Sequence, residues 1–271
     1  MNFIPFKEHK GHLNIVKAGE KTRYTGFSLL KLGPNETQRS KSEDEELVLV
    51  ILSGKCNIRI NNKIFEQLGD RKDVFSGKAT SIYIPINSSY EVIECQGGEL
   101  EIAILSAVSR RQYEPFVIIP NDVITNNRGI LNYRREVNHI LIENGEDRVD
   151  KILVGETIGY PGQWSSFISH KHDTYNPPHE TEMEEIYHYR LKPSSGFGIQ
   201  VLYNDNLSLR EAYMIKDGDT VIVLNGYHPL VVAPGTQIYY LWVMAGPYGR
   251  KMMTREDPNF AWLNNVAPLL K

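Results

Sequence analysis

The apolar residues of this chain occur in short runs that turn-forming residues separate. The runs are rich in Val, Ile, Leu and Tyr, which favour β-strands, and 21 Gly and 14 Pro divide them. The predicted strands are 47–52, 56–60, 81–84, 99–105, 151–155, 186–191, 198–203, 221–224 and 238–244. No long segment has the apolar period of an amphipathic helix, so helices are expected only at 208–213 and 259–270. Many short strands with frequent turns predict an all-β fold of the sandwich or barrel type with a few short helices.

The two halves of the chain follow a similar plan. In the first half, strands on both sides of Gly54 lead through an Asn-Asn turn to a turn that ends at Tyr90. In the second half, strands on both sides of Gly196 lead through an Asp-Gly-Asp turn to one that ends at His228. This repetition predicts two tandem antiparallel β-barrels. The expected divisions are 1–115 for the first barrel, 116–150 for a polar connecting segment, and 151–271 for the second barrel.

Composition and charge exclude several classes of protein. The 30 Lys and Arg against 33 Asp and Glu give a net charge of −3, which argues against nucleic-acid binding. The longest aliphatic run is 47–52, far short of the roughly 20 residues that a membrane helix needs. The N-terminus has no signal-peptide pattern, and Cys56 and Cys95 do not form a disulfide framework, so a cytoplasmic location is expected.

Histidines are concentrated in the second half, where three of them and a glutamate predict a metal site. His170 and His172 form a His-x-His pair, whose side chains share one face if the segment is a strand. Glu185 begins the next strand, and His228 follows a later turn. A His-x-His pair alone is more often an exposed strand pair, but three imidazoles with one carboxylate suit a divalent first-row metal. This order of ligands is the pattern of cupin barrels.

The residues around this pattern have a structural and a functional interpretation. Strand alternation places Tyr187 and Tyr189 on the face of Glu185, where they either pack in the core or contact substrate, and it turns His188 away. The faces of strand 238–244 cannot be assigned, because both carry large apolar residues. The first half has Tyr90 where the second has His228, so the first barrel is predicted to be structural and free of metal.

Motifs in both halves resemble the 5-deoxy-glucuronate isomerase family of myo-inositol catabolism. This resemblance covers nearly the whole chain. The chain also resembles, more distantly, the pectin-degradation ketol-isomerase that acts on a deoxy-hexulose uronate. The segments that carry it are 54–56, 69–75, 83–85, 165–167, 170–173, 184–187, 226–229, 239–241 and 243–247. The chain departs from the family pattern at Trp242, where Asn is usual, and at Phe260 and Ala261, where a charged pair is usual. These departures bear on the substrate more than on the reaction class.

The resemblance implies a bicupin, which is two cupin barrels in tandem, with a metal in the second barrel. By position, the implied ligands are His170, His172, Glu185 and His228, with Glu184 replacing Glu185 if the strand register differs by one residue. The metal is zinc, manganese, iron, nickel or cobalt, because this ligand set does not discriminate among them.

The implied reaction converts the aldose 5-deoxy-D-glucuronate to the ketose 5-dehydro-2-deoxy-D-gluconate. A divalent cation stabilises the enediolate that forms when the C2 proton moves. We expect Tyr187 and Tyr240 as catalytic residues and Gln200 and Arg190 as substrate-binding residues, with two further basic residues, Arg250 and Lys251, as alternatives to Arg190 for the carboxylate. The expected partners are a small deoxy uronic acid and further copies of the chain.

Two other functions remain open from the sequence. The same three-His, one-Glu set binds iron or copper in cupin dioxygenases, which would consume oxygen. A non-catalytic cupin that binds a sugar would show ligand binding without turnover.

Overall fold

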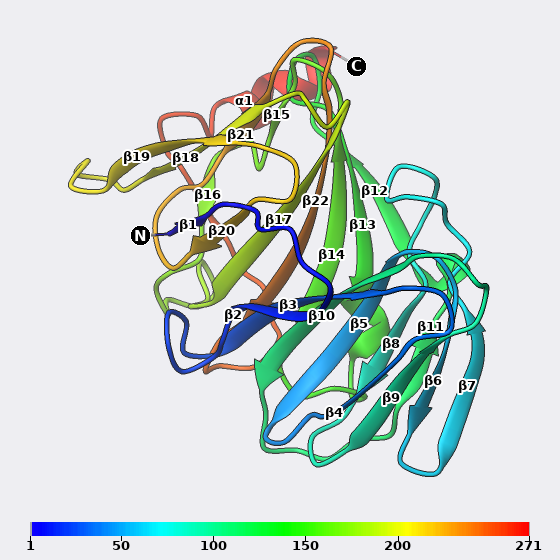
Figure 1. The fold of residues 1–271 in the computed structure, drawn as a ribbon. Coiled ribbons are helices and arrows are strands. Elements are labelled where there is room, and N and C mark those ends of the chain that lie inside the picture. The colour runs from blue at the N-terminus through cyan, green and yellow to red at the C-terminus, as the bar shows by residue number, and fades with distance from the viewer. Residues whose placement is uncertain (1, 271) are drawn as a thin grey trace.

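The computed structural model describes residues 2–270, and its strands gather into two groups (Figure 1). The prediction of an all-β chain is confirmed, and the pairs between named strands are antiparallel. The group built mainly from the first half has a six-stranded and a four-stranded sheet. The six-stranded sheet has the order β11 (Phe116–Ile118), β8 (Ser81–Ile84), β5 (Glu45–Ser53), β10 (Leu100–Val108), β3 (Thr25–Leu32), β2 (Gly11–Val16). The four-stranded sheet has the order β4 (Thr37–Lys41), β9 (Ser89–Glu94), β6 (Cys56–Ile60), β7 (Lys63–Leu68).

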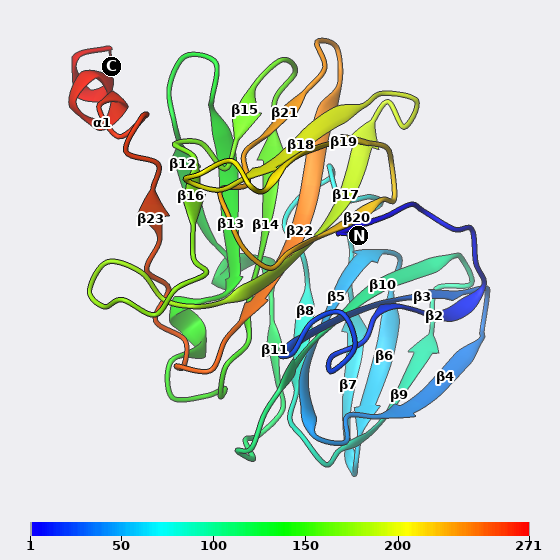
Figure 2. The same cartoon turned by 90° about the vertical axis from the view of Figure 1, so that its left-hand side faces the viewer.

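The second group repeats this arrangement with a seven-stranded and a four-stranded sheet. The seven-stranded sheet has the order β1 (Phe3–Ile4), β20 (Thr220–Val223), β17 (Glu184–Lys192), β22 (Gln237–Ala245), β14 (Leu153–Gly159), β13 (Arg135–Leu141), β12 (Ile124–Arg128). The four-stranded sheet has the order β15 (Trp164–Ser165), β21 (Leu230–Val232), β18 (Gly198–Tyr203), β19 (Arg210–Ile215). A separate pair joins β16 (His170–Lys171) to β23 (Arg255–Glu256), visible at the left of Figure 2.

Alternation along the long strands explains why their sequences are apolar on both faces. In β5, Leu47, Leu49 and Ile51 pack inside the first group, whereas Val48 and Val50 face a central cluster shared with the second group. Strand β22 behaves in the same way. Its Ile238, Tyr240, Trp242 and Met244 face the interior of the second group, and its Tyr239, Leu241 and Val243 face the central cluster. The two large sheets therefore pack back to back, and strands buried on both faces need no polar side.

The segment expected to connect the halves contributes strands to both. Within 116–150, β11 extends the six-stranded sheet, whereas β12 and β13 extend the seven-stranded one. The N-terminal strand β1 likewise crosses to the second group, where Phe3 pairs with Val221.

The helical elements differ from prediction at 208–213 and in two short 3₁₀ turns. The expected helix at 208–213 is wrong, because Arg210–Ile215 is β19, paired with β18. Leu207 has a φ of +57° and the side chain of Asn204 accepts the amide proton of Leu209, so a hairpin turn fills the position where a helix would begin. The C-terminal prediction is confirmed in part, with α1 (Leu263–Val266) followed by a 3₁₀ turn, η3 (Ala267–Leu270). Two short 3₁₀ turns, η1 (Pro120–Asp122) and η2 (Glu143–Gly145), complete the helical elements among residues 2–270.

In the described part of the chain, none of the helices has the length and apolar character needed to cross a membrane.

Candidate metal centre

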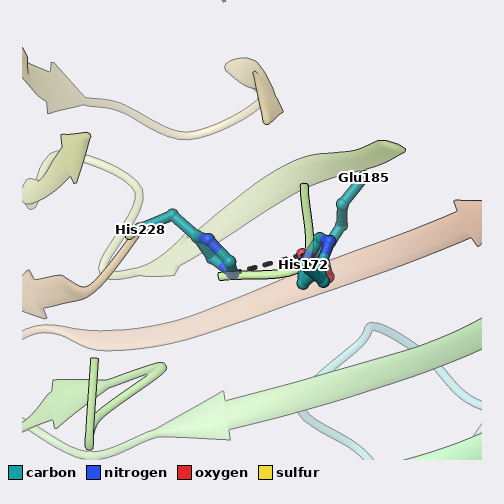
Figure 3. A group of neighbouring side chains, drawn as sticks. All are labelled: His172, Glu185 and His228. Atoms are coloured by element: carbon teal, nitrogen blue, oxygen red, sulfur yellow. Dashed lines mark hydrogen bonds and ion pairs between the residues drawn. The ribbon is translucent and has the colours of Figure 1, made fainter. Parts of the chain in front are cut away.

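Three of the predicted ligands converge inside the second group of sheets. Strand β17 supplies Glu185, the segment after β16 supplies His172, and the turn before β21 supplies His228 (Figure 3). Their ligand atoms all lie within 4.8 Å of one another. Glu185 Oε2 is 3.1 Å from His172 Nε2 and 3.4 Å from His228 Nε2. The side chains are 3%, 5% and 0% exposed for His172, Glu185 and His228, so the cluster is closed to bulk water.

Backbone carbonyls fix the protonation of each imidazole. His172 Nδ1 donates to the carbonyl of Met183 at 2.9 Å, and His228 Nδ1 to that of Gly226 at 3.0 Å. His170 Nδ1 donates to the carbonyl of Ile168 at 3.1 Å. A carbonyl oxygen can only accept, so in the neutral imidazole the proton is on Nδ1 and Nε2 presents a lone pair. Metal-binding histidines in proteins are oriented in this way.

His170 lies beside this cluster rather than in it. Its ring centroid is 4.8 Å from that of His228 and 6.4 Å from that of His172. His170 and His172 are two residues apart on an extended segment. His170 pairs with Glu256 across the β16–β23 ladder. The structure thus brings together three of the four predicted ligands and leaves the fourth adjacent to them.

The electrostatics favour a cation between these groups. Burial, followed by the charges of His170 and His172, holds the pKa of His228 well below its usual value. Burial and His172 likewise lower the pKa of His170 to about 4. Burial also opposes protonation of His172, but the hydrogen bond to Glu185, the charge of Glu185 and hydrogen bonds with the backbone together raise its pKa.

A single buried atom tests whether these residues fit a metal. His228 Nε2 is buried without a hydrogen-bond partner, although a carboxylate oxygen lies 3.4 Å away. Lone pairs of imidazole and carboxylate that face each other need a positive species between them, and an orphaned buried acceptor is otherwise costly. Histidine and carboxylate donors suit a first-row divalent ion.

Glu184 points to the other side of β17. Its carboxylate accepts the backbone N–H groups of Arg23 and Tyr24, at 2.8 and 2.9 Å for Arg23 and 2.8 Å for Tyr24. Glu184 therefore attaches the first half of the chain to β17, while alternation turns Glu185 inward. The alternative strand register considered from the sequence is not adopted.

A buried polar network supports the loop that carries the histidines. Lys171 Nζ lies 2.5 Å from Asp173 Oδ1 and 2.8 Å from Glu180 Oε1. Asp173 Oδ2 accepts the N–H of Gly226 at 2.7 Å, and the carbonyl of Gly226 holds His228. The sequence pattern did not predict this network, in which the acidic partners of Lys171 come from the segment 173–184. Alternation turns Lys171 to the face opposite the two histidines, and the burial of its ammonium there requires carboxylate partners.

The two predicted catalytic tyrosines lie next to each other on the inner face. Their ring centroids are 5.0 Å apart, and the ring of Tyr187 is 6.0 Å from that of His228. The hydroxyl of Tyr187 lies 3.1 Å from Ser166 Oγ, and that of Tyr240 lies 2.6 Å from Ser165 Oγ. Each phenol is thus held by a serine, one at the end of β15 and the other directly after it.

The predicted substrate-binding residues lie elsewhere. Gln200 is fully buried, donates from Nε2 to the carbonyl of His228 at 2.8 Å, and accepts from Tyr189. Its amide therefore holds the backbone of His228. Arg190 lies on the opposite face of β17, where it pairs with Glu101 of the first half. Of the alternatives, the guanidinium of Arg250 donates to backbone carbonyls of residues 141, 142 and 152, and Lys251 is exposed.

Sequence reasoning also missed Arg135. It begins β13, and Val137, two residues further along the same face, packs against the core of the second group. The alternation of β13 was a usable signal, but the polar composition of 116–150 had assigned this segment to a connector.

Trp242 and Phe260, which depart from the family pattern, have clear positions. The Trp242 ring fills interior space beside Gly155, where an added Cβ would lie 2.1 Å from Cζ2 of the indole. Its Nε1 donates to Thr157 Oγ1 at 3.2 Å. Phe260 packs edge-on against Phe167 in the loop before His170, with ring centroids 5.2 Å apart.

The comparison with protein families decides the affiliation. The model of the KduI/IolB family matches residues 4–263. The chain belongs to the KduI/IolB family. The chain is also similar to proteins named 5-deoxy-glucuronate isomerase. That of Geobacillus kaustophilus is 39% identical over 264 residues, covering 96% of this chain and 94% of the relative. That of Bacillus subtilis strain 168 is 33% identical over 241 residues, covering 89% and 88%.

Solved structures agree with this affiliation. A crystal structure of an IolB-like protein from Salmonella typhimurium LT2 superimposes with a TM-score of 0.91 at 31% identity, covering 97% of this chain and 99% of that one. Oxalate decarboxylase of Lactobacillus farciminis, in a formate complex, gives a TM-score of 0.65 at 8% identity, covering 96% and 87%. The second likeness concerns the fold alone, which is of the cupin type.

Proposed function

We propose that this protein is an aldose–ketose isomerase that converts 5-deoxy-D-glucuronate to 5-dehydro-2-deoxy-D-gluconate in myo-inositol catabolism. The observation that carries the proposal is the similarity to proteins of that name, at 39% identity over 96% of this chain for one of them. The inward cluster of two histidines and a glutamate supports it, because such a reaction must stabilise a developing enediolate.

The proposal includes a divalent metal held by His172, Glu185 and His228, with His170 as the fourth ligand. The unpartnered Nε2 of His228 and the carbonyl-fixed rings support this assignment. When bound, the cation would act as a Lewis acid for the carbonyl and the neighbouring hydroxyl of the sugar. His170 completes the set if its side chain rotates toward His228, whose ring is 4.8 Å away.

The residues of the chain that would handle protons are Tyr187 and Tyr240. Isomerisation moves one proton from C2 to C1 and a second between the two oxygens. Both phenols lie on the inner face with Glu185, and Ser166 and Ser165 orient their hydroxyls. In this proposal they donate hydrogen bonds to sugar oxygens, whereas Gln200 acts by holding the backbone of His228.

The proposed architecture is a bicupin. Its first barrel, 1–115, carries no metal, and its second barrel, 151–271, holds the metal site. The segment 116–150 lies between the barrels in sequence and adds strands to both sheet systems. The back-to-back packing of the two large sheets supports this division. A cytoplasmic homo-oligomer completes the proposal.

Proton NMR of the purified protein with 5-deoxy-D-glucuronate in D2O tests the activity. We expect conversion to the ketose, its loss after chelator treatment, and its return when a divalent metal is added. Deuterium in the new CH2OH group would indicate proton transfer through an enediol. Absence of conversion by metal-containing protein would contradict the substrate, and oxygen uptake under the same conditions would indicate a cupin oxygenase instead.

A further inference from the structure

Two arginines lie directly opposite each other at the edge of the seven-stranded sheet. Arg135 of β13 pairs with Arg128 of β12 in the antiparallel register, and directly paired residues share one face. That face is the inner one, because Val137 on it packs against the core of the second group and His139 contacts the ring of Trp242. In the next rows of the sheet, Thr157 pairs with both Val137 and Tyr240. Arg135 itself pairs with Gly159, and Val137, two residues further along the same face, lies in the row that leads through Thr157 to Tyr240.

Neither guanidinium has an acidic partner. Within residues 2–270, no carboxylate lies within 4.0 Å of Arg128 or Arg135. The hydrogen bond that the Arg135 side chain makes is from Nη1 to the carbonyl of Tyr133, at 3.1 Å. By contrast, the guanidinium groups of Arg71 and Arg190 are each paired with a glutamate.

This arrangement is unfavourable unless an anion joins it. Like charges directly opposite in a sheet destabilise it, and a half-buried cation without a counter-charge is costly. Burial lowers the pKa of Arg135, and Arg128 lowers it further, while the hydroxyls of Tyr240 and Tyr187 counteract these effects. The unpaired cation is therefore within electrostatic reach of both tyrosines.

We propose that Arg135, assisted by Arg128, binds the carboxylate of the substrate and so selects sugar acids over neutral sugars. The planar fork of a guanidinium matches a carboxylate with two parallel hydrogen bonds. The identity of the sugar acid rests on the proposed function, whereas the preference for an anion rests on the two arginines alone. Arg190, expected from the sequence to fill this role, is already paired.

The test compares a charged and a neutral substrate in matched variants. Wild type, Arg135→Ala, Arg135→Lys and Arg134→Ala are assayed with 5-deoxy-D-glucuronate and with 5-deoxy-D-glucose, in which CH2OH replaces the carboxylate. Arg134 is the matched control, because it is the adjacent arginine and is exposed. For the uronate, we expect Arg135→Ala to lower kcat/KM about 100-fold through KM and Arg135→Lys about 10-fold. With the neutral sugar, the kcat/KM of Arg135→Ala should equal that of wild type. The kcat/KM of Arg134→Ala should equal that of wild type with both sugars.

A binding measurement separates this inference from the proposed function. Isothermal titration calorimetry with D-glucuronate and D-glucose, on variants whose folding is checked by circular dichroism, needs no turnover. If wild type does not isomerise the uronate but binds D-glucuronate in an Arg135-dependent manner, the proposed substrate fails and the carboxylate site stands. If Arg135→Ala lowered the affinity for D-glucuronate and for D-glucose by the same factor, the carboxylate site would be overturned. Unchanged affinity of this variant for D-glucuronate would overturn it as well.

Discussion

Arg71 Nη1 lies 2.9 Å from Glu156 Oε2, and the two side chains are only 3% and 1% exposed. Arg71 belongs to a loop of the first half. Glu156 lies in the second half, on the face of β14 that packs against the central cluster. The guanidinium also donates to the carbonyl of Ile51 and lies 5.8 Å from the ring centroid of Tyr239. One buried ion pair thus crosses the central cluster where the two large sheets pack back to back.

Two other carboxylates join the halves through backbone amides. Glu46, fully buried on β5, accepts the N–H groups of Asp150, Lys151 and Ile152 at 2.9, 2.6 and 2.8 Å. Glu184 of the second half accepts the backbone N–H groups of Arg23 and Tyr24 of the first half. Each half thus sends a carboxylate into the other, so the strand that carries Glu185 is positioned by contacts from the first half.

Breaking the Arg71–Glu156 pair should destabilise the whole chain. Arg71→Met leaves the Glu156 carboxylate buried without its partner, which costs about 3–5 kcal/mol. Arg71→Met with Glu156→Gln should recover part of this loss, because no charge then remains buried. Denaturant unfolding followed by tryptophan fluorescence measures both. Lys63→Met, which breaks the exposed Lys63–Glu114 pair, is the control and should leave the midpoint unchanged. A stability of Arg71→Met equal to that of wild type would contradict this account.

Strand alternation made much of the fold and part of the site predictable. It placed Tyr187 on the face of Glu185 and turned His188 away, as the structure shows. It did not assign the faces of β22, because that strand is buried on both sides and Tyr239 and Tyr240 are equally apolar in sequence. That assignment depends on the packing of the two halves, which no local pattern encodes.

The residues whose positions were missed from the sequence lie where composition misled. Arg135 belongs to a polar stretch that reads as a connector, yet pairing with β14 makes it part of the sheet. Asp173 and Glu180 look like solvated loop residues, but the buried ammonium of Lys171 holds both. Arg190 was assigned to substrate although alternation with Glu185 already turned it outward. Pairing between strands distant in sequence and the pairing of buried charges determine where these side chains lie.

Adjacent glutamates on β17 provide a matched test of the metal centre. Glu185→Gln removes the charge that faces His172 and His228, so the purified protein should lose most of its bound divalent metal. Glu184→Gln removes a charge of the same kind one residue away, where it meets only backbone amides, and should keep the metal. Elemental analysis of both variants measures the metal per chain. Equal metal content in the two would disprove the proposed ligand set.

Burial of His188 predicts a pH dependence of stability. The ring lies against Phe27 with Nδ1 3.2 Å from Thr220 Oγ1, and burial first, then the charges of Arg190, His9 and Lys31, holds its pKa well below 6.5. Below pH 6.5 the unfolded chain binds a proton here that the folded chain does not, so stability falls as the pH falls. The slope for this group is about 1.4 kcal/mol per pH unit.

His188→Gln should remove this part of the acid sensitivity. Glutamine does not titrate, so the free energy of unfolding of the variant should decline less steeply than that of wild type from pH 6.5 to pH 5. Urea unfolding at several pH values measures the difference between the two slopes. His179→Gln, at an exposed position in the loop after β16, should follow the wild-type curve. Parallel curves for wild type and His188→Gln would mean that His188 is protonated in the folded chain.

The turn that presents His228 depends on one carboxylate outside the ligand cluster. Asp173 Oδ2 accepts the N–H of Gly226 at 2.7 Å, and the carbonyl of that same residue accepts from His228 Nδ1 at 3.0 Å. Gly226 has a φ of +82°, and an added Cβ would lie 2.6 Å from the carbonyl oxygen of Tyr203. Only glycine therefore fits at this position, and Asp173 holds the N–H of the same residue whose carbonyl orients the imidazole.

Asp173→Ala should accordingly weaken metal binding without removing a ligand. Loss of such a supporting contact typically costs about 10–100-fold in metal affinity. Competition with a chelator of known affinity measures the dissociation constant, and the midpoint of thermal unfolding of the metal-free protein checks that the fold is intact. His179→Ala, in the same loop but exposed, should bind metal as wild type does. If Asp173→Ala held the metal as tightly as wild type, Gly226 would not need Asp173 to orient His228, and the network around Lys171 would serve only to close the loop.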